Sequence, residues 1–567
     1  MLGKNVKEIA AYIIAGFLCI IILIIVMQLW KSDLSVPFEY KSDALIIAKD
    51  VKGVIDNGWI LKNKYLGAPY CFEMYDYPTS DGLLFLIIKI ISLFTSNWVM
   101  VMNIFFIMTF PLVALTTMFV FRQFKVSITT SILGGLLYAF IPYHFIRGVH
   151  HLFLSAYFMV PLMVMVILWV FTGLNIKNSK VLTSLIVCVL VSSTGIYYAA
   201  FSCLFLIIAG IYCYLNNNGQ KNLLVVSILI AVIFLGVIIN LSPSIVHRIN
   251  NGVNTEAAKR NIGEAERYGL RITQLMLPVS GHRIPSLAKI KAQYNDKAIY
   301  VNENDAVTLG IIGTVGFIIL IITLFNRTHI NSFTTLNNLS ILNIFSILIS
   351  TIGGMGAVFS AIFFNKIRAY NRISVFISYF SILAIVIILD FIYKKYCLDN
   401  KKKSIYYFII IIILIVGIFD QTSASFVPEY EKIKNEYLND SEFIKSIESS
   451  VEPGAMIYQM PYVPFPESPP VNKMDDYEHF KASLHSKNIK WSYGSMKGRI
   501  GDIWQKELNS QQLNELVDTL KKSGFSGIYI NRDGYEDKGN SIESKLNKLI
   551  KNKSWESSDE RLVFYGF

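Results

Sequence analysis

Long apolar runs alternate with polar breaks over the first 420 residues of the chain. A helix needs roughly 20 apolar residues to cross a bilayer, and eleven runs approach or reach this length. They lie at residues 11–30, 98–121, 127–146, 153–172, 181–197, 199–215, 222–241, 306–325, 335–355, 372–393 and 405–420. We therefore expect a polytopic α-helical membrane protein with about eleven transmembrane helices. The first run lacks a small-residue cleavage site and is too long for a signal-peptide core, so we interpret it as a retained span.

A further apolar run, residues 83–95, is interpreted as a helix at the membrane interface. It is short and carries Lys89, and runs of roughly 10–14 residues often lie at an interface. With the N-terminus in the cytoplasm, this choice places the basic residues of the even-numbered breaks inside, as the positive-inside rule requires. These residues are Arg122, Lys125, Lys177, Lys180, Lys221, Arg327, Lys394, Lys395, Lys401, Lys402 and Lys403. The alternative is that 83–95 crosses the membrane and another run does not.

Three long polar regions then fall outside: the loops 31–97 and 242–305, and everything after residue 420. Long loops usually have a function, so we expect the chemistry at the outer membrane–water boundary. The chain divides into a transmembrane domain, 1–420, and an extracytoplasmic soluble domain, 421–567. In the second domain, helical patterns at about 429–447, 510–523 and 541–551 alternate with the strand-like segments "AMIYQMPYV", "GIYINR" and "RLVFYGF". This alternation predicts a small α/β unit.

Composition excludes several classes of function. The 567 residues are 53% hydrophobic and 16% charged, whereas soluble proteins carry about 25% charged residues. The net charge of +12 follows membrane position, so no nucleic-acid partner is indicated. No CxxC pair, GxGxxG, Walker-type loop or GxSxG motif occurs. Disulfide frameworks, nucleotide binding and serine hydrolysis therefore have no support.

The first outer loop opens with a one-sided helical pattern headed by Asp43. The apolar positions are Ala44, Ile47, Ala48, Val51 and Ile55. Gly58 suits the end of this helix, and Lys49 and Asp50 fall on its polar side. We expect the helix to lie flat on the outer surface. A second surface helix follows "YDYPTSD", with Ser80 or Asp81 as its cap.

The stretches "YKSDALIIAKDVKGVIDNGW" and "YDYPTSDGLLFLIIKIISLF" resemble the first outer loop of the GT-C superfamily of membrane glycosyltransferases. The resemblance implies a GT-C-like fold and a bacterial surface-polysaccharide-modifying type of enzyme. It also implies a polyprenyl-phosphate sugar donor, a glycan acceptor and an acid near the start of the loop. Many members carry two adjacent acids there, but here Ala44 follows Asp43. No cofactor is expected, and the sequence does not indicate a divalent metal, although one would be compatible with the chemistry.

Sugar transfer explains why an acid belongs at this position. The anomeric carbon should react through an oxocarbenium-like state, and the incoming hydroxyl needs a base to take its proton. The departing phosphate needs cations around it. We therefore assign Asp43 as the general base, with the alternative that it only caps its helix.

Two outer stretches supply candidate phosphate ligands. "NKIRAYNRIS" offers Arg368 and Arg372, with Tyr370 between them as a substrate contact. Four residues apart, these arginines would share one face of a helix and could bind one phosphate. The alternative is contact with lipid headgroups. "EAAKRNIGEAERYGLR" offers Arg260 and Arg271, with the alternative of a solvated helix with internal ion pairs, such as Glu256 with Arg260.

The remaining candidates are substrate contacts. "IPYHFIRGVHHLFLSAY" places Arg147, His150 and His151 where the third span meets the outside. The two histidines are assigned to substrate, with metal binding or a structural role as alternatives. Asp76 and Asp81 suit turn and cap roles, which are favoured for them, and they remain candidate contacts of the acceptor.

The tail offers an acceptor surface of its own. "IKWSYGSMKGRIGDIW" presents Trp491, Tyr493 and Trp504, whose rings could bind a glycan or fill the core. The alternative function for the whole chain is a transporter or flippase of lipid-linked glycan or polysaccharide. Against it, the apolar runs contain few charges and no internal repeat, which transporters often show.

Overall fold

Each of the eleven predicted spans coincides with a helix or helix pair. The computed structural model describes residues 2–217, 220–258, 260–299, 302–325, 334–362, 367–550 and 554–567. The helices are α1 (Leu2–Met27), α4 (Trp98–Gln123), α5 (Ile128–Ala139) with α6 (Pro142–Arg147), α7 (Leu152–Ser155) with α8 (Met159–Phe171), α9 (Lys180–Val191), α10 (Ile196–Asn217), α11 (Gln220–Asn251), α15 (Gly310–Phe325), α16 (Thr334–Ser350), α18 (Ser374–Tyr396) and α19 (Asn400–Gln421). Lys259, Arg327 and Lys366, which belong to the basic stretches noted above, lie outside the described residues.

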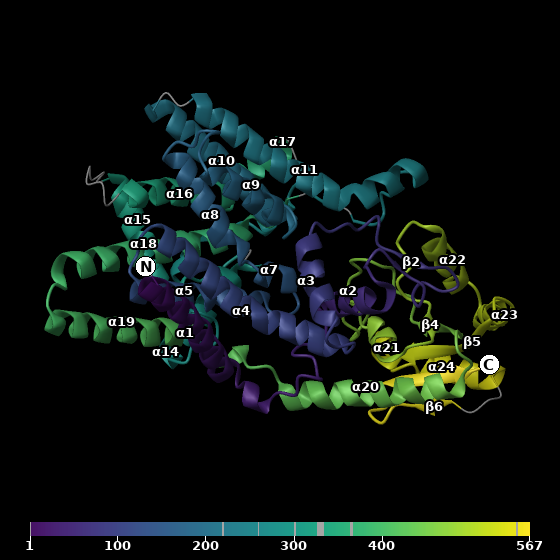
Figure 1. Ribbon diagram of the computed structural model, residues 1–567. Coiled ribbons are helices and arrows are strands. Elements are labelled where there is room, and N and C mark those ends of the chain that lie inside the picture. The colour runs from purple at the N-terminus through teal and green to yellow at the C-terminus, as the bar shows by residue number, and fades with distance from the viewer. Residues whose placement is uncertain are drawn as a thin grey trace.

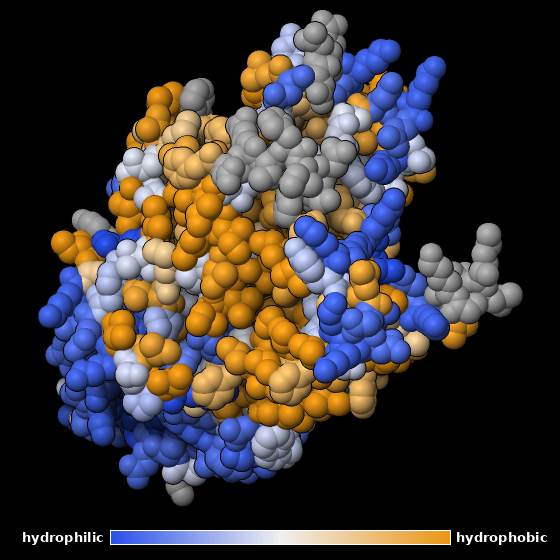
Figure 2. Space-filling model, turned by 90° about the vertical axis from the view of Figure 1, so that its left-hand side faces the viewer, coloured by the Kyte–Doolittle hydropathy of each residue, from blue (hydrophilic) through white to orange (hydrophobic). Residues whose placement is uncertain are grey.

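The chain is a multi-pass membrane protein. In the described ranges, seven helices are long and apolar enough to cross a membrane, while α8, α9, α15 and α16 are shorter apolar helices. Figure 2 shows a band of apolar side chains across one face of the molecule, with hydrophilic surface on its flanks. Such a band is what hydrocarbon chains require of the protein surface in contact with them.

A soluble α/β domain follows α19, as predicted. Its five-stranded sheet has the order β4-β3-β5-β7-β6. β3 is parallel to β4 and β5, and β7 is antiparallel to β5 and β6. The bounds are β3 (Met456–Met460), β4 (Lys490–Trp491), β5 (Phe525–Asn531), β6 (Trp555–Glu556), β7 (Leu562–Gly566), α20 (Tyr430–Ser450), α21 (Phe480–His485), α22 (Ile500–Asn509), α23 (Leu513–Lys522) and α24 (Asn540–Leu549). The three predicted strands and three predicted helices are present; α21, α22, β4 and β6 were not predicted.

The first outer loop lies between the two domains. Figure 1 shows α2 (Asp43–Asn57) between the helix bundle and the soluble domain, with α20 along one edge. α2 packs against α4, against α21 and against α3 (Gly82–Ser92), which is the helix expected at 83–95. Gly58 ends α2 with φ 81°, a conformation that glycine adopts without strain.

One expectation for α2 is wrong. Lys49 and Asp50 do not face water, because they are only 3% and 5% exposed. Their side chains pair over 2.5 Å, and the Lys49 ammonium lies 4.2 Å from the centroid of the Phe72 ring. Phe465 and Phe480 of the soluble domain also surround this ammonium. The domain therefore covers the face of α2 that the sequence pattern assigned to solvent.

The second outer loop does not form the long solvated helix considered above. Residues 252–263 are not helical in the described part of the chain. The loop contains only the short helices α12 (Glu264–Arg267) and α13 (Ile272–Met276), then α14 (Pro285–Lys297) and a 3-10 turn, η2 (Asn304–Val307). α17 (Met355–Ile362) and the 3-10 turn η4 (Tyr370–Ile373) precede α18. The short strands β1 (Lys62–Asn63) and β2 (Phe72–Glu73) pair in the first loop.

Candidate functional site

Asp43 is the first residue of α2, and Ser42 occupies the N-cap position without a side-chain capping bond. The simple capping role is therefore not the one Asp43 performs. Its Oδ2 lies 3.5 Å from Nε2 of His151, and 45% of its side-chain surface is exposed. The carboxylate thus stands at the start of a packed helix and points to the segment that follows α6.

Gly148 brings the two histidines to this carboxylate. It ends α6 with φ 46°, a left-handed value that favours glycine. The chain then turns so that His150 Nδ1 lies 2.9 Å from Glu39 Oε2. The His150 and His151 rings are 4.8 Å apart in a T-shaped arrangement. The structure therefore places both predicted histidines beside Asp43.

Two buried arginines lie close to one acid near this site. Arg147 Nη1 donates to Glu303 Oε2 over 2.7 Å, and Arg372 Nη2 lies 3.6 Å from the same oxygen. The Arg372 guanidinium also lies 4.3 Å from the centroid of the Tyr197 ring. Both arginines contribute to the charge environment of His151. The structure thus brings Asp43, His151 and Arg372, three of the residues named from the sequence, into one cluster.

Several donors in this cluster have no partner. Arg147 Nε and Nη2 and Arg372 Nε are buried donors that make no hydrogen bond, and His151 Nδ1, the acceptor nitrogen when the proton is on Nε2, is also buried without a partner. Buried polar groups are almost always hydrogen-bonded, because an unsatisfied donor loses its water without compensation. Unpaired guanidinium nitrogens on two neighbouring arginines are therefore the arrangement expected of a site that receives an anion.

Arg260 and Arg368 lie at the edge of this cluster and are paired. Arg260 makes a two-pronged ion pair with Glu467 of the soluble domain, at 2.8 and 2.7 Å. Tyr77 donates to the same carboxylate over 2.8 Å. Arg368 Nη1 lies 3.3 Å from Glu264. The described partner of Arg260 is thus Glu467, not the neighbouring Glu256 of the predicted intrahelical pair.

Arg368 and Arg372 are not on one helix. Arg368 precedes η4, and Arg372 lies within it. The prediction that they share a helical face is therefore wrong. They still contribute to one charge environment, because both act on the carboxylate of Glu303.

The other predicted contacts lie elsewhere or serve other partners. Asp76 accepts from Arg499 Nε over 2.6 Å and from Asn254 over 3.0 Å. Asp81 stands at the N-cap of α3 and accepts a hydrogen bond from the Thr79 hydroxyl. Burial raises the pKa of Asp81 to about 6.

Arg271 and Tyr370 stand at the starts of the short helical elements α13 and η4. Arg271 is the N-cap of α13, and its backbone N–H donates to Asn304 Oδ1 over 3.0 Å. The Tyr370 hydroxyl is buried without a hydrogen-bond partner.

The pKa values of Asp43 and Glu303, two acids of the cluster, are shifted in opposite directions. Burial raises the pKa of Asp43, the nearby acids Glu303 and Glu467 add to this, and His150 and Arg372 oppose it. Burial also acts to raise the pKa of Glu303, but Arg147 and Arg372 outweigh it and hold the pKa below its usual value. One carboxylate is thus made more basic while its neighbour stays ionised, the pattern that separates acid–base roles in active sites.

His151 is held neutral. Burial lowers its pKa well below the usual value, and Arg147 and Arg372 lower it further. A neutral imidazole with its proton on Nε2 can donate toward Asp43 without adding charge.

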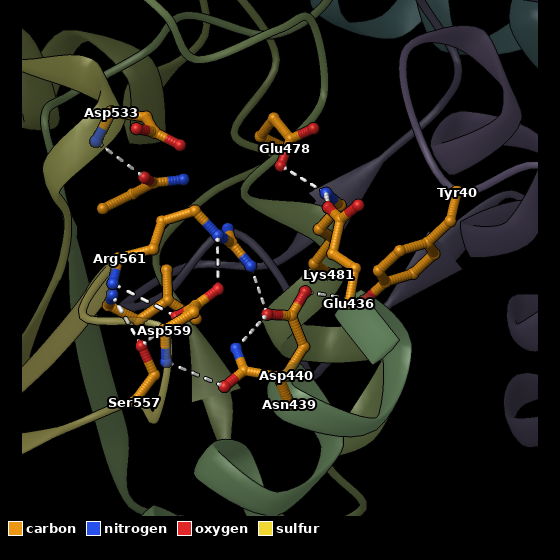
Figure 3. A network of polar contacts seen from close by, with 12 residues as sticks. Tyr40, Glu436, Asn439, Asp440, Glu478, Lys481, Asp533, Ser557, Asp559 and Arg561 are labelled. Atoms are coloured by element: carbon orange, nitrogen blue, oxygen red, sulfur yellow. Dashed lines mark hydrogen bonds and ion pairs between the residues drawn. The ribbon is translucent and has the colours of Figure 1, made fainter. Parts of the chain in front are cut away.

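A buried network ties the residues before Asp43 to the soluble domain (Figure 3). The Tyr40 hydroxyl donates to Asp440 Oδ2 over 3.1 Å and lies 2.8 Å from His485 Nε2. Asp440 is 1% exposed and forms an ion pair with Arg561. Lys481, whose ammonium lies 4.6 Å from the Tyr40 ring centroid, pairs with Glu436 and Glu478. The soluble domain therefore anchors the segment that carries Asp43.

The sequence analysis named Arg147 as a cation at the outer end of the third span but gave it no role, and it did not assign Glu303 or Glu467 to this cluster. The reasoning applied to Arg372, also a cation at the outer end of a span, would have assigned Arg147 to the phosphate as well. Glu467 lies in the proline-rich "PYVPFPESPP" segment of the other domain, and no local pattern links it to Arg260. Among the described residues, no three His, Cys, Asp or Glu side chains are grouped to hold a metal ion.

Comparison with known proteins identifies the fold. No family model and no curated protein matches the chain. A variant of the arabinofuranosyltransferase AftD from Mycobacteria matches with a TM-score of 0.51 at 12% identity, over 92% of this chain and 36% of that one. ArnT from Cupriavidus metallidurans bound to undecaprenyl phosphate matches with a TM-score of 0.48 at 9% identity. This match covers 100% of this chain and 98% of that one. The apo oligosaccharyltransferase of Archaeoglobus fulgidus matches with a TM-score of 0.45 at 11% identity. This match covers 92% of this chain and 70% of that one.

The match to the arabinofuranosyltransferase variant shows a shared fold. This chain therefore shares the fold of that arabinofuranosyltransferase, in agreement with the fold that the sequence resemblance implied. It spans 36% of the length of that protein. Since a fold hosts many functions, the activity has to be argued from the site.

Proposed function

We propose that this protein is an integral-membrane glycosyltransferase. It moves a sugar from a polyprenyl-phosphate donor to a hydroxyl of an extracytoplasmic glycan, with Asp43 as general base. The observation that carries the proposal is one cluster: Asp43 lies beside His151, and Arg147 and Arg372, two buried arginines with unpaired donors, act on that histidine. The GT-C fold is consistent with this chemistry.

In the proposed reaction, the acceptor oxygen attacks the anomeric carbon and its proton passes to Asp43. The bond between the anomeric carbon and the phosphate oxygen breaks, and polyprenyl phosphate leaves with the electron pair. Arg147 and Arg372 bind the phosphate as its negative charge grows, which lowers the barrier. Neutral His151 orients the Asp43 carboxylate without competing for the phosphate. Asp43 thus takes up the proton, and Arg147 and Arg372 balance the negative charge of the phosphate.

The donor's lipid tail determines where the site must open. Arg372 lies in η4, directly before the membrane helix α18, and Arg147 ends α6. We place both at the outer end of their helices, with the N-terminus in the cytoplasm and the soluble domain outside. A phosphate bound there can keep its tail in the bilayer. Labelling with a membrane-impermeant reagent tests this: in a Cys71→Ser background, a cysteine replacing exposed Ser558 should react in intact cells, and reaction only after lysis would contradict the topology.

The deciding experiment measures polyprenyl phosphate released by purified protein from a panel of polyprenyl-phosphate sugars. Asp43→Asn should reduce transfer by at least roughly 100-fold, because general bases contribute about 10²–10⁴-fold, while donor binding stays unchanged. Asp56→Asn is the matched control, since Asp56 lies on the same helix and pairs with Lys52. Near-normal turnover by Asp43→Asn would reject the assignment, and movement of intact lipid-linked sugar without release would support a transporter instead.

A further inference from the structure

A cavity of about 340 Å³ lies where the first outer loop meets the soluble domain. Tyr70, Glu73 and Tyr75 line it from the loop, His247 from α11, and Arg499 from the segment before α22. A second hollow of about 400 Å³ shares Tyr75 and His247 with the first. Both volumes fall within the roughly 300–1,000 Å³ typical of small-ligand sites.

The walls of these hollows present flat ring surfaces. Tyr75 and His247 stack with centroids 4.6 Å apart and an interplanar angle of 13°, and this stacked pair lines both hollows. Tyr70 is 42% exposed at the rim. An aromatic ring with a polar tip suits a ligand that has apolar faces and polar edges.

The charges at the walls are already neutralised. Arg499 forms a two-pronged ion pair with Asp76, at 2.6 and 3.0 Å. Lys62, which lines the second hollow, pairs with Glu73 over 2.8 Å. These two pairs leave no net cationic field for a phosphate, in contrast to the arginine cluster near Asp43. Hydroxyl groups can still hydrogen-bond to paired carboxylates and to the amides of Asn250 and Asn251, which line the second hollow.

A short polar path connects the cavity to the proposed active site. Asp76, in the cavity wall, accepts from Asn254, which also donates to the backbone oxygen of Lys497 over 2.7 Å. Lys497 Nζ donates to the backbone oxygen of Glu467 over 2.9 Å. Tyr77, two residues after Tyr75, donates to the Glu467 carboxylate. A chain-like ligand in the cavity would therefore extend toward the cluster around Asp43.

We infer that this cavity and the adjoining hollow form a binding site for a neutral oligosaccharide, which holds the acceptor glycan away from the reacting hydroxyl. The identification of the ligand as the acceptor rests on the proposed function. The site itself rests on the stacked pair, the exposed Tyr70 ring and the neutralised wall charges. Sugar rings would stack on Tyr70 and on the Tyr75–His247 pair while their hydroxyls bond to the polar groups between them.

The test measures binding of the detergent-solubilised full chain to immobilised neutral arabino-, manno- and gluco-oligosaccharides, without donor. Tyr70→Ala and Tyr75→Ala should each weaken binding by about tenfold, the scale of one aromatic contact. Tyr70→Phe should bind like wild type, because the ring remains. Trp555→Ala is the matched control, since Trp555 is an exposed aromatic that stacks on Phe564 in the soluble domain's sheet.

A second measurement needs no ring substitution. Cys71 is exposed and lines the cavity, so a bound oligosaccharide should slow its alkylation at least about threefold; Cys71→Ser provides the background. Absence of binding across the panel, unchanged binding by both alanine variants, or unprotected Cys71 with ligand bound would each overturn the inference. Asp43→Asn should retain binding in full. Loss of transfer in that variant therefore tests the proposed function separately from this site.

Discussion

Arg147 donates to Glu303 over 2.7 Å, although 156 residues separate them in the chain. The Arg147 side chain is 3% exposed, and two of its nitrogens have no partner. Arg372 lies near the same carboxylate. Glu303 is therefore the shared counter-charge of two buried cations, and their remaining donors are available to a second anion.

Replacement of Arg147 by lysine should weaken donor binding about tenfold or more. Lysine keeps the charge but loses the planar fork that binds phosphate through two bonds, and hydrogen bonds to charged groups contribute about 1.5–3 kcal/mol. Titration with a polyprenyl-phosphate sugar measures this. Arg283→Lys is the control, because Arg283 bonds to Thr422 at the other end of the loop. Equal affinity of Arg147→Lys and wild type would remove Arg147 from the phosphate site.

Glu303→Gln should make the protein more dependent on a bound anion. Arg147 and Arg372 would lose their shared carboxylate, so the variant should melt at a lower temperature without ligand. Added polyprenyl phosphate should then raise the melting temperature more than it does in wild type, because the anion replaces the missing charge. Glu429→Gln, which removes an exposed partner of Lys432, is the control. Identical shifts in variant and wild type would contradict the model.

The raised pKa of Asp43 predicts the pH dependence of transfer. A general base acts only when deprotonated, so kcat/KM should fall on the acid side with a midpoint above the ordinary value of about 3.9 for aspartate. Asp43→Asn should abolish this acid limb in the residual activity. The profile of rate against pH decides the point, and a midpoint at or below the ordinary value would contradict it.

The same shift has a consequence for stability. A carboxylate whose pKa is higher in the folded state binds more protons there than in the unfolded state, so its contribution to stability falls as pH rises from the unfolded pKa through the folded one. At pH 7 ionised Asp43 should therefore disfavour folding. Asp43→Asn should melt no lower than wild type at pH 7, with the difference shrinking toward about pH 4. A destabilised variant would instead point to a structural role.

The buried network that joins Tyr40 to the soluble domain should contribute to the thermal stability of the protein. Asp440→Asn would deprive Arg561, whose side chain is 14% exposed, of its more buried partner. Breaking a buried ion pair costs about 3–5 kcal/mol, so thermal unfolding should begin at a lower temperature. Asp559→Asn, which removes the more exposed partner of the same arginine, should have a smaller effect. Equal effects of the two variants would show that the buried pair does not dominate.

Tyr40→Phe separates anchoring from overall stability. It removes the hydroxyl that bonds to Asp440 and His485, at a cost of about 1–3 kcal/mol for the groups left unpaired. Because Asp43 follows three residues later, transfer should fall more than donor binding does. Unchanged transfer would show that this network does not position Asp43.

The helices and the head of the first loop could be predicted from the sequence because the signals are local. Apolar length determined the spans, and the position of Asp43 before an apolar stripe placed it on α2. The sequence also placed His151 at the outer end of the third span, on the same side of the membrane as Asp43. These features depend on propensity, periodicity and backbone conformation within a few residues.

Contacts between the domains could not be predicted in this way. Lys49 and Asp50 follow the pattern of a solvent-facing surface, yet Phe465 and Phe480 cover Lys49. Arg260 has Glu256 at helical spacing, but it pairs with Glu467, 207 residues later. The observed partner of Arg260 is a distant acid of the other domain, and no single sequence reveals which distant acid that will be.

The bidentate contact of Arg260 with Glu467 constrains how such chains can be recombined. A chimera that received a foreign soluble domain without the matching stretch 254–260 would leave Arg260 without its partner, close to Asp43, the proposed general base. Functional grafts should therefore transfer residues 254–260 together with residues 461–499. A chimera that is divided only at the boundary between the domains would separate these two segments.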